Sequence, residues 1–151
     1  MNFSAKTEYG VRLMVALGRG DAGRPTSLKA IAEAERLPLS YLEHVVADLK
    51  RAGLVAATRG AHGGYRLGRA ASEISMYEVV NALEGAIAPM ECFVTLPTNR
   101  VTCSHQVDLG RACATKLLWT RVQGGVIKAL QGTTLAELVE FSETHAPVAV
   151  A

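Results

Sequence analysis

The hydrophobic pattern between Ser27 and Leu67 predicts two helices followed by a β-hairpin. In the second helix, apolar residues recur with the spacing i, i+3, i+4 and i+7, which places them on one stripe that faces a core. These residues are Leu42, Val45, Val46 and Leu49. Pro38 suits the first helical turn and Gly53 suits a left-handed C-terminal cap, so the predicted helix covers about residues 38–52.

The side of this helix opposite the stripe carries side chains that can make contacts outside the fold. At about 100° per residue, the residues that point away from the stripe are Ser40, His44, Ala47 and Arg51, with Tyr41 and Glu43 on its flanks. Residues 54–59 and 65–67 can then pair as strands across 60–64, whose glycines allow the positive φ values of a tight reversal. Arg59, His62 and Arg66 lie on this hairpin.

Helix, turn, helix and hairpin in this order predict a winged helix-turn-helix. In such a unit a helix enters the major groove of duplex DNA, and a basic ribbon contacts the backbone or the minor groove. The candidate DNA-binding residues are Ser40, Tyr41, Glu43, His44, Arg51, Arg59 and His62. A protein-interaction module with a solvated charged face is the alternative that the pattern leaves open.

Helix signals continue on both sides of this unit. Ser4 can cap a first helix over about residues 5–18, with an inward stripe of Tyr9, Leu13, Ala16 and Leu17. Thr26 or Ser27 caps the short helix that precedes the second one. Capping boxes begin two later helices, at Ser75 with Glu78 and at Thr134 with Glu137; Gly85 ends the first of these, and the second runs through Phe141.

Periodicity disappears over residues 86–110, where Pro89 and Pro97 interrupt the chain. A structureless loop of this length is usually functional or disordered. A longer helix is expected over about 112–131, and its apolar residues suggest dimer packing: Leu117, Leu118, Val122, Val126, Ile127 and Leu130. Gly124 and Gly125 interrupt it, which leaves close helix contact and a kink open.

The expected fold is mainly α with a small β-hairpin wing. Its expected organisation is a winged helix-turn-helix over 1–69, a connecting helix and cysteine-bearing loop over 70–111, a dimerisation helix and a short helix over 112–142, and a flexible tail over 143–151. The chain has 151 residues, of which 49% are hydrophobic, enough for a real core.

Charge favours a nucleic-acid partner only locally. The formal net charge is +2, but residues 50–69 contain no acid and hold Lys50, Arg51, Arg59, Arg66 and Arg69. The N-terminus lacks an apolar signal core, and no stretch of about 18 apolar residues occurs. We therefore expect a soluble, cytoplasmic protein.

The cysteines Cys92, Cys103 and Cys113 lack the paired CxxC of common zinc modules, so their spacing alone is a weak ligand signal. The usual role of such a residue is that of a small buried hydrophobe. Two of them lie in the polar, proline-containing loop, however, and the third opens a helix, whose dipole favours a thiolate. Soft thiolates select iron–sulfur clusters, zinc or copper(I).

No enzyme signature accompanies these cysteines. No local Ser/His/Asp or Cys/His pattern occurs, and the glycine-rich residues 60–64 lack the Lys-Ser/Thr of a phosphate-binding loop. The sequence therefore predicts a regulator rather than an enzyme.

Five segments carry a resemblance to a known family: SAKTEYGVR at 4–12, LSYLEH at 39–44, GLV at 53–55, RGAHGGYRL at 59–67 and TTLAEL at 133–138. Over roughly residues 1–141 the chain resembles the Rrf-type family of winged-helix transcriptional regulators, which includes IscR-like and NsrR-like iron–sulfur regulators. The resemblance implies a homodimer whose long helices cross. It also implies an iron–sulfur cluster at Cys92, Cys103 and Cys113, with 2Fe–2S favoured and 4Fe–4S as the alternative.

Such a cluster would govern binding to a DNA operator in response to iron–sulfur supply, redox state or nitric oxide. Zinc or a thiol switch is the alternative. The chain departs from the family in two ways: its cysteines are more widely spaced, and Lys116 stands where IscR-like members have a ligating histidine. NsrR-like members use an acidic residue of the partner's first helix, which matches Glu8. A solvated pair of Glu8 with Arg12 is the other interpretation of Glu8, and His105 and Asp108 are alternative ligands.

Overall fold

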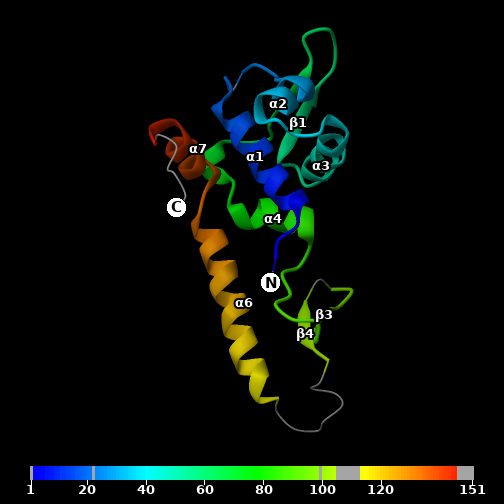
Figure 1. Ribbon diagram of the computed structural model, residues 1–151, viewed down its shortest axis with the longest axis vertical. Coiled ribbons are helices and arrows are strands. Elements are labelled where there is room, and N and C mark those ends of the chain that lie inside the picture. Colours follow the sequence, from blue (N-terminus) through cyan, green and yellow to red (C-terminus); the bar gives the residue numbers. More distant parts are fainter. Residues whose placement is uncertain (1, 22, 99, 105–112, 146–151) are drawn as a thin grey trace.

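The computed structural model describes residues 2–21, 23–98, 100–104 and 113–145. Its elements, in chain order, are α1 (Ala5–Arg19), α2 (Leu28–Glu35), α3 (Leu39–Arg51), β1 (Val55–Thr58), β2 (Gly64–Leu67), the 3-10 helix η1 (Ala71–Glu73), α4 (Met76–Glu84), β3 (Phe93–Thr95), β4 (Val101–Cys103), α6 (Ala114–Gly132) and α7 (Leu135–Thr144). The expected mainly α fold with a β-hairpin wing is confirmed. The helices α1 to α4, the hairpin of β1 and β2, and α7 together form one helical head, from which α6 extends (Figure 1).

The first helix, α1, lies at the centre of the head and contacts α2, α3, α4, α7 and β2. Leu13 and Leu17 are buried as the periodicity predicts, and Met14 beside them is fully buried although the predicted stripe left it out. Gly10 permits a close approach of α4, because a Cβ atom there would lie 2.2 Å from Cδ1 of Leu83. A helix surrounded on so many sides buries more than one stripe.

The helix-turn-helix follows the sequence signals closely. The Ser27 hydroxyl accepts a hydrogen bond from the backbone N–H of Ala30 at 3.1 Å and so caps α2. Pro38 is the N-cap of α3, and Gly53 follows its end with a φ of 75°, as a left-handed cap requires. The predicted range of 38–52 therefore differs from the observed helix by one residue at each end.

The wing, residues 55–67, is an antiparallel pair in which Val55 faces Leu67 and Thr58 faces Gly64. An extra bridge joins Thr26, just before α2, to Tyr65, with both N–O distances at 2.8 Å. The wing is thus fastened at its base to the connection between α1 and α2.

Both predicted capping boxes are present, and Gly85 ends α4 with a φ of 78°. Ser4 is the N-cap residue of α1, as predicted, but its side chain makes no capping hydrogen bond, because its hydroxyl donates instead to Oε1 of Glu84 at 2.5 Å. The Thr7 hydroxyl donates to the same oxygen at 2.6 Å. Burial raises the pKa of Glu84, but these hydrogen bonds and the charge of Lys6 outweigh it and lower the pKa. The last helix, α7, ends at Thr144 rather than Phe141.

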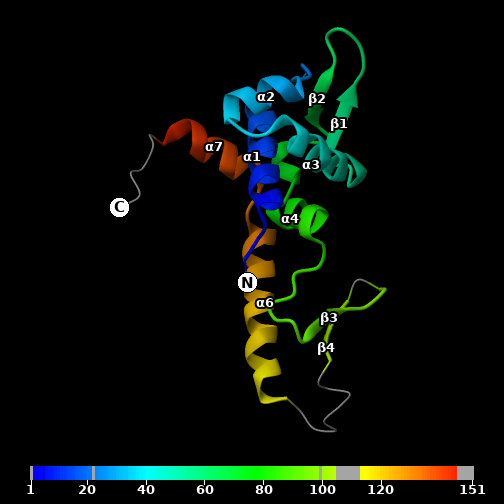
Figure 2. The ribbon, with the colours of Figure 1, turned by 45° about the vertical axis from the view of Figure 1, so that its right-hand side comes forward.

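The expected loop over 86–110 is partly wrong, since β3 and β4 form a second antiparallel hairpin with Phe93 opposite Cys103 and Thr95 opposite Val101. These strands are short and rich in β-branched residues, which favour strand pairing, and Pro97 lies outside the ladder. Figures 1 and 2 place this hairpin at the end of the head from which α6 extends.

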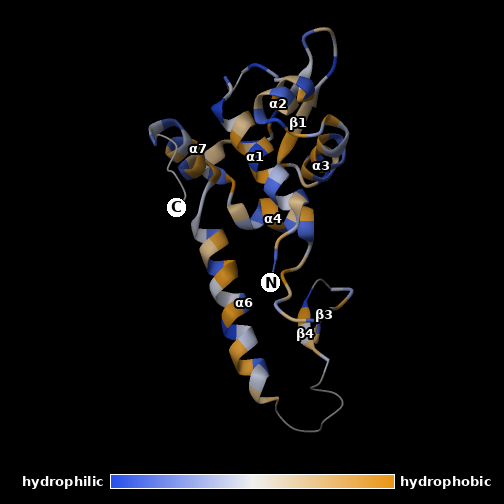
Figure 3. Cartoon of the chain, in the orientation of Figure 1, coloured by the Kyte–Doolittle hydropathy of each residue, from blue (hydrophilic) through white to orange (hydrophobic). Residues whose placement is uncertain are grey.

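The long helix α6 starts directly after Cys113 and contains no buried residue. Leu117 and Leu118 are 61% and 55% exposed, whereas Val122, Val126, Ile127 and Leu130 are half-buried against the rest of the chain. Apolar residues recur along the whole helix (Figure 3). Gly124 and Gly125 lie inside the uninterrupted helix, and a Cβ atom at either would meet nothing within 4 Å, so no close contact within the described chain requires these glycines. None of the described helices combines the length and the apolar character that crossing a membrane requires.

Candidate nucleic-acid interface and cysteine centre

The helix α3 turns toward solvent the face that the periodicity predicts. Its buried residues are Leu42, Val45, Val46 and Leu49, and its exposed residues include Ser40, Glu43, His44, Ala47 and Arg51. Arg59 and His62 at the tip of the wing are also exposed. All the candidate DNA-binding side chains are therefore accessible, and their contact with DNA stays a prediction.

Tyr41 is a candidate whose ring packs against another aromatic ring of the fold. Its ring centroid lies 5.4 Å from that of Tyr9 in α1, with the ring planes at 81°. Tyr41 nevertheless remains 38% exposed. This edge-to-face contact fixes the position of the Tyr41 ring at the start of α3.

The basic residues between 50 and 69 are not equally available to an anionic partner. Arg51 pairs with Asp48 at 2.8 Å, and Arg69 pairs with Glu78. Among the described residues no ion pair forms at the remaining ones, which are Lys50, Arg59 and Arg66. The sequence pattern missed both acidic partners because they lie outside the acid-free stretch. The uncompensated positive charge therefore lies on the wing and at the end of α3.

A chain of polar contacts links α1 to the exposed end of α3. Nζ of Lys6 lies 2.5 Å from Oδ2 of Asp48, and the other oxygen of Asp48 pairs with Arg51. The hydrogen bond from Lys6 lowers the pKa of Asp48; burial opposes this shift, and Arg51 adds to it. Asp48 thus stays ionised and contacts both Lys6 of α1 and Arg51 of α3. Sequence reasoning missed Lys6 because no local pattern connects it to α3.

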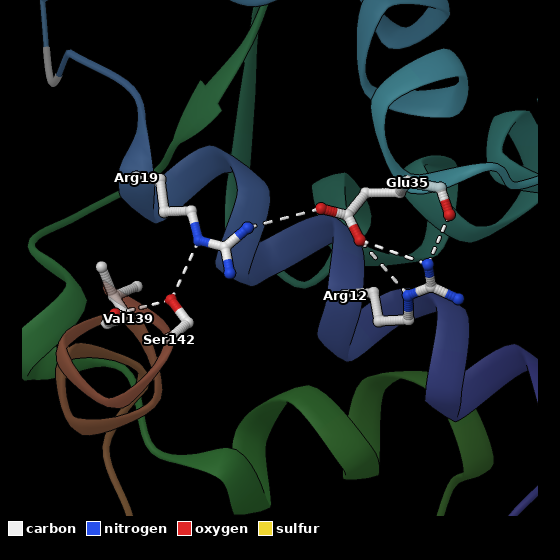
Figure 4. A network of polar contacts seen from close by, with 5 residues as sticks. All are labelled: Arg12, Arg19, Glu35, Val139 and Ser142. Atoms are coloured by element: carbon white, nitrogen blue, oxygen red, sulfur yellow. Dashed lines mark hydrogen bonds and ion pairs between the residues drawn. The ribbon is translucent and has the colours of Figure 1, made fainter. Parts of the chain in front are cut away.

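The predicted pair of Glu8 with Arg12 exists, but it is the weaker contact of Arg12. Their charged groups are 3.9 Å apart, and the Glu8 side chain is 65% exposed. Arg12 instead donates to the Glu35 carboxylate at 3.3 Å and to the Glu35 backbone carbonyl, at the end of α2 (Figure 4). Glu8 is therefore an accessible carboxylate, and its neighbour Arg12 binds mainly to Glu35.

The same Glu35 connects the helix-turn-helix to α7. Arg19 lies 3.5 Å from Oε1 of Glu35, and its Nε donates to the Ser142 hydroxyl at 2.9 Å. That hydroxyl in turn donates to the Val139 carbonyl at 2.6 Å (Figure 4). Glu35 is the shared acceptor of two arginines of α1, so α2, α1 and α7 are held in one polar network.

The three cysteines are brought together by three different elements. Cys92 directly precedes β3, Cys103 ends β4 and Cys113 is the N-cap of α6. Ser104 fixes the hairpin end, since its backbone N–H and its hydroxyl donate to the Cys92 carbonyl at 2.9 and 3.2 Å. Cys103 is 2% exposed, and the other two cysteines are half-buried.

The thiols influence one another. Burial raises the pKa of Cys92, and repulsion from Cys103 and Cys113 raises it further. A hydrogen bond with Thr115, at 3.1 Å between sulfur and oxygen, lowers the pKa of Cys113, and the Lys116 N–H and the Cys103 thiol act in the same direction. Cys103 therefore interacts with both other cysteines.

These residues offer the ligand type that a group bound by thiolates requires, because soft ligands from three segments share one region. Within the described ranges, however, no group of three or more His, Cys, Asp or Glu side chains is arranged to hold a metal ion. The thiols are thus neighbours without forming a closed set of ligands. The alternative ligands His105 and Asp108 lie outside the described residues.

Two relatives are similar in sequence over nearly the whole chain. The HTH-type transcriptional regulator CymR of Bacillus subtilis (strain 168) is 35% identical over 143 residues, which cover 95% of this chain and 93% of the relative. The HTH-type transcriptional regulator IscR of Vibrio atlanticus is 33% identical over 143 residues, which cover 95% of this chain and 78% of the relative.

Solved structures agree with this similarity. The structure of CymR, the global cysteine regulator of B. subtilis, gives a TM-score of 0.75 at 35% identity and covers 93% of this chain and 98% of that one. The structure of T. potens IscR gives a TM-score of 0.74 at 30% identity, with 98% and 94% covered. The family described as "Rrf2: Iron-dependent Transcriptional regulator" matches residues 3–141. The chain therefore belongs to the Rrf2 family of transcriptional regulators and is not an enzyme.

Proposed function

We propose that two copies of this chain bind an operator in double-stranded DNA, and that an iron–sulfur cluster at Cys92, Cys103 and Cys113 governs this binding. The observation that carries the proposal is the proximity of the cysteines before β3, at the end of β4 and at the N-cap of α6, in which Cys103 influences both others. Three separate segments thus bring soft ligands into one region, in a chain whose family is described as iron-dependent.

The helix-turn-helix and the wing support the DNA-binding part. The exposed face of α3 has the size and polarity to enter a major groove, where Glu43 and His44 can contact base edges. Arg59, which has no ion-pair partner among the described residues, lies on the wing, where it can reach the backbone or a narrow minor groove. Each copy thus supplies one helix and one basic ribbon to a half-site.

The exposed leucines of α6 support a homodimer. Leu117 and Leu118 project from a helix that extends beyond the head, where burial would remove two large apolar side chains from water. Crossing of two such helices would relate the two α3 helices by a two-fold axis. Half-sites for symmetric pairs of this kind are about 34 Å apart.

The fourth ligand that we propose is Glu8 of the partner subunit. Its carboxylate is exposed and lies on α1, which also carries Lys6 and Arg12, the residues that contact α3 and α2. When bound, the cluster would supply iron that reacts with oxidants or nitric oxide, or that is lost when iron–sulfur supply fails. The cysteines and Glu8 would then hold the loop of one chain against the first helix of the other.

Zinc binding or a thiol switch is the second candidate. It is favoured by the mutual contact of the thiols without a closed ligand set in the described residues. The relative CymR is also named a global cysteine regulator. In this case the same cysteines would respond by releasing zinc or by forming a disulfide.

Anaerobic purification, followed by an absorption spectrum and by analysis of iron, sulfide and zinc per chain, separates these candidates. Iron with equal sulfide and visible absorption supports the cluster, and the iron count distinguishes 2Fe–2S from 4Fe–4S. Zinc without sulfide supports the first alternative, and metal-free protein with oxidant-sensitive thiols supports the second. Selection from a randomised DNA pool tests the DNA-binding part of the proposal. If the protein shows no salt-dependent affinity for any duplex, DNA binding is contradicted.

A further inference from the structure

A pocket at the base of the wing lies apart from the cysteines, and it shares Arg66 with the basic surface of the wing. Its volume is about 480 Å³, and it is bounded by the end of α1, the connection to α2, strand β2 and residues 68–71. Sites for small molecules commonly measure about 300–1,000 Å³. The wing lies at the opposite end of the head from the β3–β4 hairpin (Figure 2), so this pocket and the cysteine centre are separate.

Three polar side chains that line the pocket are unused by the rest of the described chain. The guanidinium groups of Arg24 and Arg66 and the hydroxyl of Thr26 form no hydrogen bond or ion pair among the described residues. Arg69 also lines the pocket, but it pairs with Glu78. The pocket thus offers two uncompensated cations and a hydroxyl to a ligand.

The remaining lining is partly apolar. Leu17, which is 6% exposed, Leu67 and Ala71 contribute hydrocarbon surface beside the arginines. The one acidic side chain in the lining, Asp21, accepts a hydrogen bond from the backbone N–H of Gly23 at 3.3 Å. Guanidinium groups bind carboxylates in a bidentate manner, and the apolar surface suits a short carbon chain.

We propose that this pocket binds a small organic dicarboxylate, with Arg24 and Arg66 on its carboxylates and the leucines against the carbon chain between them. This inference goes beyond the proposed function, because neither the cysteines nor a cluster takes part in it.

The position of the pocket couples its ligand to the wing. Arg24 belongs to the connection before α2 and Arg66 to β2, and the two segments meet at the hydrogen-bonded pair of Thr26 and Tyr65. A dicarboxylate that joins the two arginines crosses this junction and adds a further link between the wing and the start of α2.

Titration calorimetry of the full-length chain with glutarate, at constant ionic strength and without DNA, tests the site directly. We expect saturable binding with one glutarate per chain. Loss of one charge-assisted hydrogen bond weakens affinity by about tenfold, so Arg24→Ala and Arg66→Ala should each do so. Arg100→Ala, in the turn between β3 and β4, removes an exposed arginine outside the pocket and should bind glutarate like the wild type.

Three results would overturn the proposal. Equal glutarate binding by wild type, Arg24→Ala and Arg66→Ala would exclude the arginines. Equal affinity for sulfate and glutarate would show an anion site with no use for the carbon chain. Unchanged glutarate binding with reduced, less salt-dependent DNA affinity in Arg24→Ala would show that the pocket arginines contact DNA phosphates. Because glutarate binding is measured without DNA and in cluster-free protein too, its failure leaves the proposed regulatory function untouched.

Discussion

Lys6 in α1 and Asp48 in α3 form an ion pair with 2.5 Å between Nζ and Oδ2. Lys6 also donates to the Leu83 carbonyl at 3.1 Å, and Asp48 also pairs with Arg51. One carboxylate, 21% exposed, therefore joins α1 to an arginine on the proposed DNA-binding face. The orientation of α3 relative to α1 depends on this contact as well as on the apolar core.

The first prediction concerns Lys6→Met. A partly exposed ion pair contributes about 0.5 kcal/mol, so the variant should unfold at slightly lower urea concentration at pH 7. The folded-state pKa of Asp48 lies below its ordinary value of 3.8, chiefly because of Lys6. The contribution of the ion pair to the free energy of unfolding is therefore complete above about pH 5, and it is lost as the pH falls through the folded-state pKa of Asp48. Urea unfolding of cluster-free protein from pH 7 to pH 3 should show the difference from wild type shrinking below pH 4.

Lys29→Met is the matched control for this measurement. Lys29 pairs with Glu33 at 4.0 Å, and both side chains are 70% or more exposed, so its removal should leave the urea midpoint unchanged at every pH. Equal effects of both substitutions would mean that the contact of Lys6 with Asp48 is no more than a solvated pair.

The second prediction separates affinity from sequence preference at the DNA. Arg59→Ala should weaken operator binding about tenfold and lower the salt slope by about one, because one cation leaves the wing. Glu43→Ala should mainly change which sequences bind, since a carboxylate accepts a hydrogen bond from cytosine and repels nearby phosphate. Binding to a randomised pool measures both, with Arg100→Ala as an arginine control distant from the wing. Unchanged affinity and preference in both variants would contradict the assignment.

The contrast between local and distant contacts explains what the sequence could predict. The caps at Ser27, Ser75 and Thr134 and the left-handed Gly53 and Gly85 were predictable, because each depends on residues a few positions apart. So was the exposed face of α3, which follows from helical geometry alone.

Contacts across the fold were not predictable in this way. The Ser4 hydroxyl donates to Glu84, 80 residues away, instead of capping α1. Arg12 contacts Glu35, 23 residues away, more closely than it contacts Glu8. The β3–β4 hairpin was missed because its strands have three residues each, too few for an alternating pattern to stand out. The grouping of the cysteines follows from that hairpin and from the start of α6.

The third prediction tests the dimer. Leu118→Asp places a charge on the exposed apolar part of α6 in both subunits. If each leucine contributes about 1.5 kcal/mol on burial, the paired loss weakens dimerisation about 100-fold. Analytical ultracentrifugation should show monomers at concentrations where the wild type is dimeric. Thr120→Asp, an exposed polar position of the same helix, should remain dimeric. A wild type that is monomeric throughout would remove the basis for the two-fold arrangement.

The fourth prediction concerns the cysteines. Replacing Cys92, Cys103 or Cys113 by alanine should abolish the iron and sulfide content but leave the helical content and the dimer intact, because the core of the head lies outside the hairpin. Ser104→Ala, which removes a hydroxyl beside Cys92 and no thiol, should retain the cluster. Full iron and sulfide in any single cysteine variant would show that the ligand set is wrong. Unfolding of the wild type by a chelator would point instead to a structural metal.

The last prediction concerns Glu8, the proposed ligand from the partner subunit. Glu8→Ala should still assemble a cluster, because the cysteines remain, but the absorption spectrum should change. The difference in operator affinity between loaded and cluster-free protein should become smaller, since the cluster would no longer hold the first helix of the partner. Spectra and paired affinity measurements test this, with Glu33→Ala as a control for the loss of an equally exposed carboxylate.

The affinity difference should become smaller because of the way α1 is attached to α2 and α3. Lys6 and Arg12, on either side of Glu8, contact Asp48 of α3 and Glu35 of α2, so a ligand at Glu8 would constrain the helix that positions both. Because half-sites are about 34 Å apart, even a small rotation of one head would misplace its α3. Coupling is reciprocal, so operator DNA should prolong the lifetime of the wild-type cluster more than that of the variant. If Glu8→Ala matches the wild type in spectrum, cluster lifetime and affinity ratio, Glu8 is only a solvated helix residue that lies near Arg12, and His105 or Asp108 becomes the next ligand to test.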